Sequence, residues 1–137
     1  MEYNPYALTG KTILVTGASS GIGRAVAIEC SRLGAHVILS ARNKEKLEET
    51  LKMMEGHGHQ VIECDLSKEK EVSLLIDEVP EIQGLVNNAG TTMTVPVPFI
   101  KFNVLSDLLK VNTIAPIMIL SGLVLSLIHI SEPTRPY

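Results

Sequence analysis

TGASSGIG, residues 16–23, is the stretch that decides the fold of this chain. It follows a short apolar, β-branched run, Thr12 to Thr16 (TILVT), of the kind that forms a strand buried on both faces of a sheet. After it, apolar residues recur at helical spacing and a glycine stands where a left-handed C-terminal cap is expected: Ile22, Val26, Cys30, Leu33 and then Gly34. The stretch therefore predicts a glycine-rich turn between a buried strand and a helix.

The three glycines of this turn allow the backbone to pass tightly beneath a pyrophosphate. Backbone N–H groups and the positive end of the following helix then face the phosphates. The spacing is GxxxGxG rather than the common GxGxxG, and no lysine follows as a phosphate-loop NTPase would need. The predicted nucleotide-binding residues of the turn are Gly17, Ala18, Ser19, Ser20, Gly21, Ile22 and Gly23.

Strand and helix patterns alternate along the rest of the chain. Further buried strands are predicted at 36–40, 60–64 and 84–87, and helices at 44–55, from Ser67 as N-cap to about Val79, and from about Phe99 through Asn112 toward Ser126. Pro116 is expected to kink the last helix. Four strand–helix alternations with short connections predict an α/β fold, a doubly wound parallel sheet of the Rossmann type with helices on both faces.

Composition narrows the classes of partner. A net charge of -3 and a pI near 5.8 give no basic surface for nucleic acid, so a small-molecule partner is expected. Residues 1–10 lack the pattern of a signal peptide, which predicts a cytoplasmic protein. The apolar stretch 114–130 is short for a membrane span and contains polar residues and Pro116, so a helix buried between sheet and partner subunit is predicted instead.

The cysteines and the paired histidines suggest no metal site. Cys30 and Cys64 are far apart in sequence and each falls in an apolar pattern, so both are predicted to be free thiols of the core. His57 and His59 flank a glycine in a loop without a third ligand nearby, so they are predicted to be solvated.

A second motif makes the resemblance to a known family specific. The four residues that close the fourth predicted strand are Asn87, Asn88, Ala89 and Gly90 (NNAG). With TGASSGIG they resemble, in order and spacing, the two signatures of the short-chain dehydrogenase/reductase family. The resemblance extends from Thr12 to about Ser126 and implies a nicotinamide dinucleotide cofactor. Extended relatives that act as epimerases or dehydratases are disfavoured, because they usually carry TGxxGxxG.

The resemblance also implies roles for single residues. Asn87 would help to hold the central sheet, and Asn88, Ala89 and Gly90 would line the nicotinamide-ribose side of the pocket. Asp65 and Leu66 would contact the adenine edge, the alternative being that Asp65 only caps a turn. Asn112 matches the family's active-site asparagine, which bends its helix and holds a water in the proton relay.

The end of the second predicted strand indicates the form of the cofactor. An acidic side chain there would bind the ribose 2′-hydroxyl of NAD, but Ala41 occupies that place. Arg42 follows with a planar fork of donors suited to a 2′-phosphate. NADP(H) is therefore the predicted cofactor, the alternative being that Arg42 is a solvated arginine that opens the next helix.

The family's catalytic tyrosine, with a lysine four residues on, and its serine have no counterpart in these 137 residues. The tyrosines are Tyr3, Tyr6 and Tyr137, and none can begin a YxxxK motif. We expect residues 1–126 to be the NADP(H)-binding portion of a C-terminally truncated member and residues 127–137 to be a non-native or disordered tail.

The predicted function is that of an NADP(H)-dependent carbonyl reductase or alcohol dehydrogenase, similar to 3-oxoacyl-acyl-carrier-protein reductases and acting on a small carbonyl or alcohol substrate. The truncated chain would be inactive alone. The alternative is a non-catalytic dinucleotide-binding fragment. A full-length version is expected to be a homo-oligomer that pairs through the helix carrying Asn112.

Overall fold

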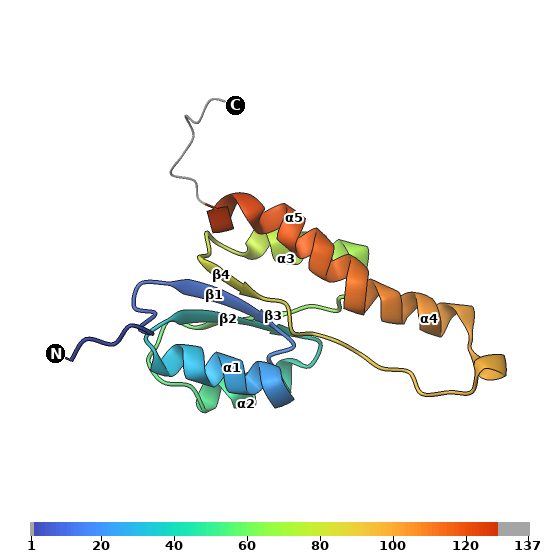
Figure 1. Ribbon diagram of the computed structural model, residues 1–137, viewed down its shortest axis with the longest axis horizontal. Helices are drawn as coiled ribbons and strands as arrows, with labels where there is room; N and C mark the ends of the chain where they lie inside the picture. The colour runs from blue at the N-terminus through green and yellow to red at the C-terminus, as the bar shows by residue number, and fades with distance from the viewer. Residues whose placement is uncertain (1, 129–137) are drawn as a thin grey trace, which may run out of the picture.

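A computed structural model of the chain describes residues 2–128 and places four parallel strands in one sheet. The strands are β1 (Thr12–Thr16), β2 (His36–Ala41), β3 (Gln60–Glu63) and β4 (Gly84–Val86). Their order across the sheet is β3-β2-β1-β4, with β1 paired to β2 on one side and to β4 on the other (Figure 1). The predicted α/β fold with a parallel sheet is confirmed.

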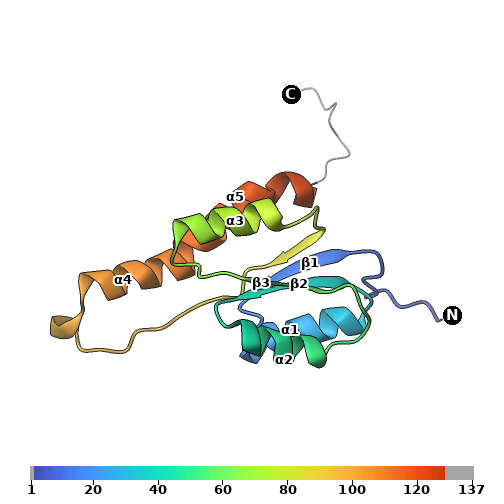
Figure 2. The ribbon, with the colours of Figure 1, turned by 180° about the vertical axis from the view of Figure 1, so that it is seen from behind.

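Helices cover both faces of the sheet (Figures 1 and 2). Helices α1 (Gly21–Arg32) and α2 (Lys44–Lys52) lie on one face, and α3 (Glu69–Glu78) and α5 (Ala115–Ile128) lie on the other. Between β4 and α5 the chain passes through a 3-10 turn (Val97–Phe99), α4 (Phe102–Leu109) and a π-helical segment (Lys110–Ile114). In both views α4 projects beyond the end of the sheet.

The strand sequences explain why both faces are covered. Successive side chains of a strand point to opposite faces. On β1, Leu14 packs in the cluster with α3 and α5, whereas Ile13 and Val15 pack in the cluster with α1 and α2. Because the apolar residues of this strand pack against helices on both faces of the sheet, the sequence TILVT does not alternate between apolar and polar residues.

The buried side of α1 differs from the predicted one. Ile22, expected to lead the apolar face, is 75% exposed. The buried residues are Gly23, Ala27 and Ser31, and Val26 and Cys30 are only partly buried beside them. Close packing of α1 on the sheet admits small residues at the centre of the contact, so residue size and not hydrophobicity selects this face.

Several predicted helix boundaries are wrong by a few residues. Helix α2 ends at Lys52 and not at Glu55. The N-cap of α3 is Lys68, because the Ser67 hydroxyl donates to Asp65 Oδ1 at 2.7 Å and is not available to the helix. The end of α1 agrees with the prediction, since Gly34 has a φ of 98° just beyond the helix.

The predicted long helix is divided by a π-helical segment. Lys110–Ile114, which contains Asn112, forms wider turns between α4 and α5. Pro116 lies in the first turn of α5 and has no N–H to donate back along the helix. The helix is therefore irregular close to Pro116, as predicted, but the irregular turns lie at Lys110–Ile114, before the proline.

Helix α5 is apolar on more than its buried side. Ala115, Ile119 and Leu123 are buried against α3 and the sheet, whereas Ile117 and Leu120 are 60% and 48% exposed. Among the described residues, the continuous helical stretch Phe102–Val124 is long and apolar enough to cross a membrane, judged by length and composition alone. Core helices of soluble proteins share that length and composition. The predicted tail at 127–137 lies outside the described residues, apart from the backbone at 127 and 128 that completes α5.

Truncation of a central core side chain tests this packing. Leu14 is fully buried between the sheet and the α3–α5 layer, so Leu14→Ala is expected to lower the free energy of unfolding by about 3 kcal/mol, measured by urea denaturation. The matched control is Ile22→Ala, which removes an exposed side chain and is expected to change stability by less than about 0.5 kcal/mol. Equal losses in the two variants would contradict the observed burial.

Candidate functional site: a cleft at the carboxyl ends of the strands

A cleft of about 610 Å³ opens where the parallel strands end. It is bounded by the glycine-rich turn after β1, the segments that follow β2 and β3, the loop after β4, and α4 with the π-helical segment. Ligands of doubly wound sheets bind in this place, outside the carboxyl ends of the strands. The lining residues predicted from sequence are Gly17, Ser19, Ser20, Arg42, Leu66, Asn88, Ala89 and Gly90.

The glycine-rich turn is held by close contact with the segment after β4. Gly17 has a φ of 68°, and a Cβ there would lie 2.8 Å from Asn88 Nδ2 and 2.9 Å from Ala89 Cα. A Cβ on Gly23 would collide with the carbonyl oxygen of Gly17 and lie 2.5 Å from Asn88 Nδ2. Two of the three glycines are therefore required by space, and this approach brings α1 and the NNAG segment to the same end of the cleft.

Hydrogen bonds complete the junction between β1 and β4. The Thr16 hydroxyl oxygen accepts the N–H groups of Asn88 and Ala89, each at 3.1 Å. Asn88 Nδ2 donates to the carbonyl oxygens of Thr16 and Gly17, each at 3.3 Å. The side chains that join these strand ends are thus those of Thr16 and Asn88. Asn87 instead donates to Pro116 O at 3.3 Å and connects β4 to α5.

Asn112 makes a paired contact with the loop that follows NNAG. Its Oδ1 accepts the Thr91 N–H at 2.8 Å, and its Nδ2 donates to Thr91 O at 2.7 Å. Thr91 and Val111 line the cleft, whereas Asn112, which follows Val111 in the chain, does not. The side-chain amide therefore holds the cleft's outer loop against the π-helical segment; its part in a proton relay stays a prediction.

Two cationic side chains lie at the end of the cleft beside β2. Arg42 and Lys46 both line it, together with Ser40, Ala41 and Asn43. Asn43 is the N-cap of α2 and accepts the Lys46 N–H at 3.1 Å, which fixes the first helical turn. A neighbouring hollow beside Arg42 includes Glu45 and Glu63, so the cations are not isolated from acidic groups. Pairing two cations at one end of the cleft favours an anionic ligand group there.

In the segment after β3, Asp65 differs from its neighbours in its position relative to the cleft. Cys64, Leu66 and Ser67 line the cleft, but Asp65 does not. Its Oδ1 accepts the Ser67 N–H at 2.9 Å and the Ser67 hydroxyl at 2.7 Å. These contacts are those of the turn-capping alternative, and a contact of Asp65 with adenine stays a prediction.

Both titratable groups of this segment are perturbed. Partial burial opposes ionisation of Asp65, but the Ser67 hydrogen bonds, aided by Lys68 and Arg42, hold the pKa of its carboxyl below the ordinary value. Burial, together with the negative charges of Glu71 and Asp65, raises the pKa of Cys64 to about 12. The thiol in the cleft wall is therefore protonated at neutral pH.

The remaining predicted site residues do not line the cleft. Ala18 is fully buried and donates its N–H to Ser40 O at 3.2 Å, whereas Gly21, Ile22 and Gly23 belong to the first turn of α1. The first N–H groups of a helix have no intrahelical acceptor, so these three residues would act through their backbone. That role, like the role of Asp65, stays a prediction.

Sequence reasoning missed four residues that shape the site: Thr16 as an acceptor, Lys46, Arg24 and Thr50. Lys46 lies in the first turn of α2, four residues after Arg42, and this nearness of two cations in the sequence could have revealed it. Arg24 donates to Thr50 from 26 residues away. No local pattern connects residues at such a distance.

The paired histidines are not both solvated as predicted. His59 Nδ1 accepts the Val37 N–H at 3.1 Å, and its Nε2 lies 2.6 Å from Glu55 O. The His59 side chain therefore accepts a backbone N–H group near the start of β2, whereas His57 is exposed. Of the two cysteines predicted for the core, Cys64 is buried and Cys30 is half-buried, and both are free thiols. Within residues 2–128, no three His, Cys, Asp or Glu side chains are grouped so as to hold a metal ion.

Adding one methyl group at the closest contact tests the turn. Gly23→Ala is expected to weaken nucleotide binding by at least about tenfold and to destabilise the fold, because the new Cβ collides with backbone. Isothermal titration with NADPH and urea denaturation measure the two effects. The control is Gly56→Ala, whose nearest neighbour is His59 Nε2 at 3.8 Å; it is expected to lose about 1 kcal/mol from its φ of 77° and to bind normally.

A pH titration tests the Ser67–Asp65 contact. Ser67→Ala removes one donor to the carboxylate, so the pKa of Asp65 is expected to rise toward its ordinary value, as read from side-chain NMR shifts. A depressed folded-state pKa stabilises the protein above the unfolded pKa, and this stabilisation is lost as pH falls through the folded value. Ser67→Ala is therefore expected to cost more stability at neutral pH than in acid. Ser73→Ala, at an exposed position of α3, should leave both measurements unchanged.

The chain has extensive similarity to known proteins. It is 45% identical over 85 residues to the 3-oxoacyl-acyl-carrier-protein reductase of Rickettsia felis, a match that covers 62% of this chain and 35% of the relative. It is 38% identical over 119 residues to 3-ketodihydrosphingosine reductase of Mus musculus, covering 79% of this chain and 36% of the relative. The chain thus spans about a third of the length of these relatives.

A solved structure has the same architecture. The crystal structure of a metagenomic short-chain oxidoreductase in complex with NADP superposes with a TM-score of 0.79 at 33% identity, over 87% of this chain and 57% of that one. Residues 11–132 match the family described as short chain dehydrogenase, whose members are NAD(P)-dependent oxidoreductases. This match takes in the cleft and every residue that joins β1 to β4, and the chain therefore belongs to the short-chain dehydrogenase family.

Proposed function

We propose that this chain binds NADP(H) in the cleft and forms the nucleotide-binding part of an NADP(H)-dependent carbonyl reductase or alcohol dehydrogenase. One observation carries the choice of cofactor: Arg42 and Lys46 both line the end of the cleft beside β2, where Ala41 stands in place of an acid. An acid there would repel a 2′-phosphate, whereas two cations attract it. The NADP in the similar metagenomic oxidoreductase supports the same choice.

The residues around the cleft fit the parts of such a nucleotide. The turn at Ser19 and Ser20 offers backbone N–H groups and the start of α1 to a pyrophosphate. Leu66 offers an apolar wall beyond β3, where an adenine ring would pack. Asn88 to Gly90 form the opposite wall, toward α4, and would adjoin the nicotinamide ribose. When bound, the nicotinamide ring supplies hydride chemistry, and the residues of this chain bind and orient it.

The proposed substrate is a small molecule with a carbonyl or alcohol group. The reductase names of the Rickettsia felis and Mus musculus relatives support this class. The cleft extends past the NNAG segment to Met93 and Val104, which give this end apolar side chains beside Thr92 and Asp107, and a substrate would approach the nicotinamide here. Asn112, which fixes Thr91 at that end, is the proposed active-site asparagine.

The 137-residue chain is proposed to bind the nucleotide without turning over substrate. Its 137 residues contain no YxxxK motif, and Tyr3 and Tyr6 are 89% and 76% exposed before β1, far in sequence from the NNAG segment. A tyrosine with a lysine-lowered pKa is the acid that this family uses to protonate the product alkoxide. The second candidate function is therefore a dinucleotide-binding module, and oxidation of NADPH with a ketone substrate separates it from an enzyme.

Net charge and exposed apolar side chains support proposals on partners, location and oligomeric state. A net charge of -3 supports small-molecule partners over nucleic acid, and we propose a cytoplasmic location without a membrane span. Exposed apolar side chains on α4 and α5, among them Phe102, Ile117 and Leu120, support homo-oligomer formation by a full-length version.

Charge reversal at Arg42 tests the cofactor proposal. Arg42→Asp replaces a phosphate donor with a repelling carboxylate, so NADPH is expected to bind at least about tenfold more weakly while NADH binds as well or better. Reduced-nicotinamide fluorescence measures both affinities without interference from tryptophan, which the chain lacks.

A matched variant separates cofactor recognition from general charge. Arg32→Asp changes the same charge at an exposed position near the far end of α1 and is expected to leave the NADPH-to-NADH affinity ratio unchanged. Equal affinity of the unaltered chain for NADPH and NADH would show that the cofactor proposal is wrong.

A further inference from the structure

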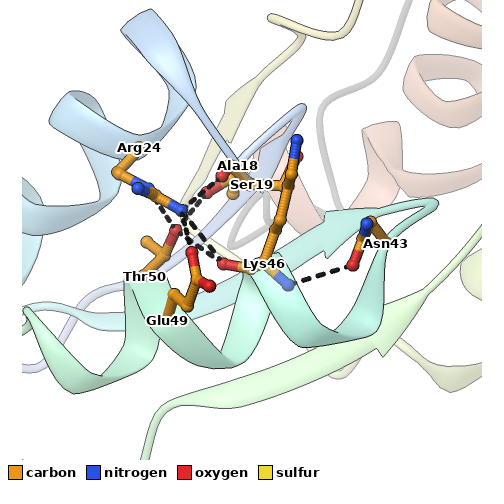
Figure 3. A network of polar contacts seen from close by, with 7 residues as sticks. All are labelled: Ala18, Ser19, Arg24, Asn43, Lys46, Glu49 and Thr50. Carbon is orange, nitrogen blue, oxygen red and sulfur yellow. Dashed lines mark hydrogen bonds and ion pairs between the residues drawn. The ribbon is translucent and has the colours of Figure 1, made fainter.

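A polar network joins the glycine-rich turn to α1 and α2 (Figure 3). Arg24, in the first turns of α1, donates from Nε to Thr50 Oγ1 at 2.9 Å and from Nη2 to Ser19 O at 2.6 Å. The Thr50 hydroxyl, on α2, lies 2.8 Å from Ala18 O, the nearer of its acceptors. Neither Arg24 nor Thr50 lines the cleft. We call these contacts the Arg24–Thr50 network.

The network is built into the interior of the protein. Thr50 is fully buried, and the Arg24 side chain is 24% exposed. Burial of a hydroxyl and a guanidinium disfavours folding unless their hydrogen bonds are made, and both groups make them here. An apolar pair would fill the same space without the desolvation cost of a buried hydroxyl and guanidinium. The polar pair therefore calls for an explanation beyond packing.

Peptide geometry supplies that explanation. In a planar trans peptide, the C=O of one residue points opposite to the N–H of the next. Binding of Ala18 O and Ser19 O behind the turn therefore directs the N–H groups of Ser19 and Ser20 toward the opposite side, where both residues line the cleft. The Ser20 carbonyl accepts the Arg24 N–H at 3.2 Å, which orients the N–H of Gly21 likewise.

The same network fixes the first turn of α2. Arg24 Nη2 donates to Lys46 O at 3.3 Å and pairs with Glu49 Oε2 at 3.4 Å. Lys46 is one of the two cations at the end of the cleft, and Figure 3 shows its side chain extending from α2 alongside Ser19. The network therefore holds the backbone of the glycine-rich turn and the backbone from which the Lys46 side chain extends in one arrangement.

We propose that Arg24 and Thr50 are positioning residues for phosphate binding: without touching the nucleotide, they hold the carbonyl groups of Ala18 and Ser19 behind the turn so that the turn presents only N–H donors to a pyrophosphate. The inference rests on the proposed function, since it assigns a dinucleotide to the cleft. Release of either carbonyl lets its peptide rotate and brings a negative dipole to the anion.

Removal of the Thr50 hydroxyl is the direct test. Thr50→Val keeps the shape of the side chain and is expected to weaken NADPH and NADH by the same factor, about five- to tenfold, because both carry the pyrophosphate. Binding of adenosine, which has no phosphate, is expected to stay unchanged when followed by NMR. Thr50→Ser restores the hydroxyl and should bind both nucleotides within about twofold of the unaltered chain.

A second pair of variants covers the case in which Thr50→Val fails to fold. Arg24→Gln removes the Ser19 contact at a partly exposed position and is expected to weaken both nucleotides similarly. Arg32→Gln, on the same helix, breaks only the exposed ion pairs to Glu29 and Glu55 and is the matched control. Circular dichroism confirms that the variants being compared are folded at the temperature of measurement.

The outcomes distinguish this inference from the proposed function. Normal affinity for both nucleotides in folded Thr50→Val and Arg24→Gln would overturn the positioning role while leaving the cofactor proposal intact. An equal loss of adenosine binding would also overturn it, because a merely structural role would disturb the whole cleft. Absence of nucleotide binding by the unaltered chain would overturn both, whereas a change in the NADPH-to-NADH ratio alone would point to Arg42 and Lys46.

Discussion

The closeness of Gly17, Gly23 and Asn88 is the constraint on which the rest of the structure depends. It lets α1 begin directly against the end of β1, and it places the Asn88 amide where it donates to the carbonyl oxygens of Thr16 and Gly17. The cleft wall after β4 and the turn after β1 are therefore parts of one packed unit. No side chain larger than hydrogen fits at either glycine without moving backbone.

Much of this arrangement follows from local sequence. Apolar β-branched runs predicted the strands, and the glycine spacing predicted the turn, because both patterns report on a few neighbouring residues. Fine detail depended on packing that the pattern does not contain. Ile22 was assigned to the buried face of α1 by its hydrophobicity, yet the buried residues of that face are the small Gly23, Ala27 and Ser31. Ser67 was assigned as a cap by its residue type, yet Asp65 binds its hydroxyl.

The candidate site residues also include some that local motifs predict and some that depend on contacts between distant parts of the chain. Motif residues such as Asn88 and Gly90 line the cleft, and both the motif and the strand end are visible in the sequence; their contact with a nucleotide stays a prediction. Arg24 and Thr50 were not foreseen, because their partnership joins two helices and each residue alone is an ordinary helical position. The family resemblance predicted a bend at Asn112, but not its π-helical form, because the spacing of apolar residues does not show which carbonyl group each N–H group bonds.

The bonds between Thr16 and Asn88 have a consequence for the order of folding. They join residues 72 positions apart, and β1, which emerges first in synthesis, has β4 as one of its two neighbours. Pairing over such a separation requires a long loop to close before any contact rewards it, which slows folding of parallel sheets. The β4 side of the first strand therefore stays unpaired until Asn88 has been made, and the cleft, whose lining extends to Val111, is complete only later. A dinucleotide that binds only the finished junction would shift the equilibrium toward the folded chain by mass action.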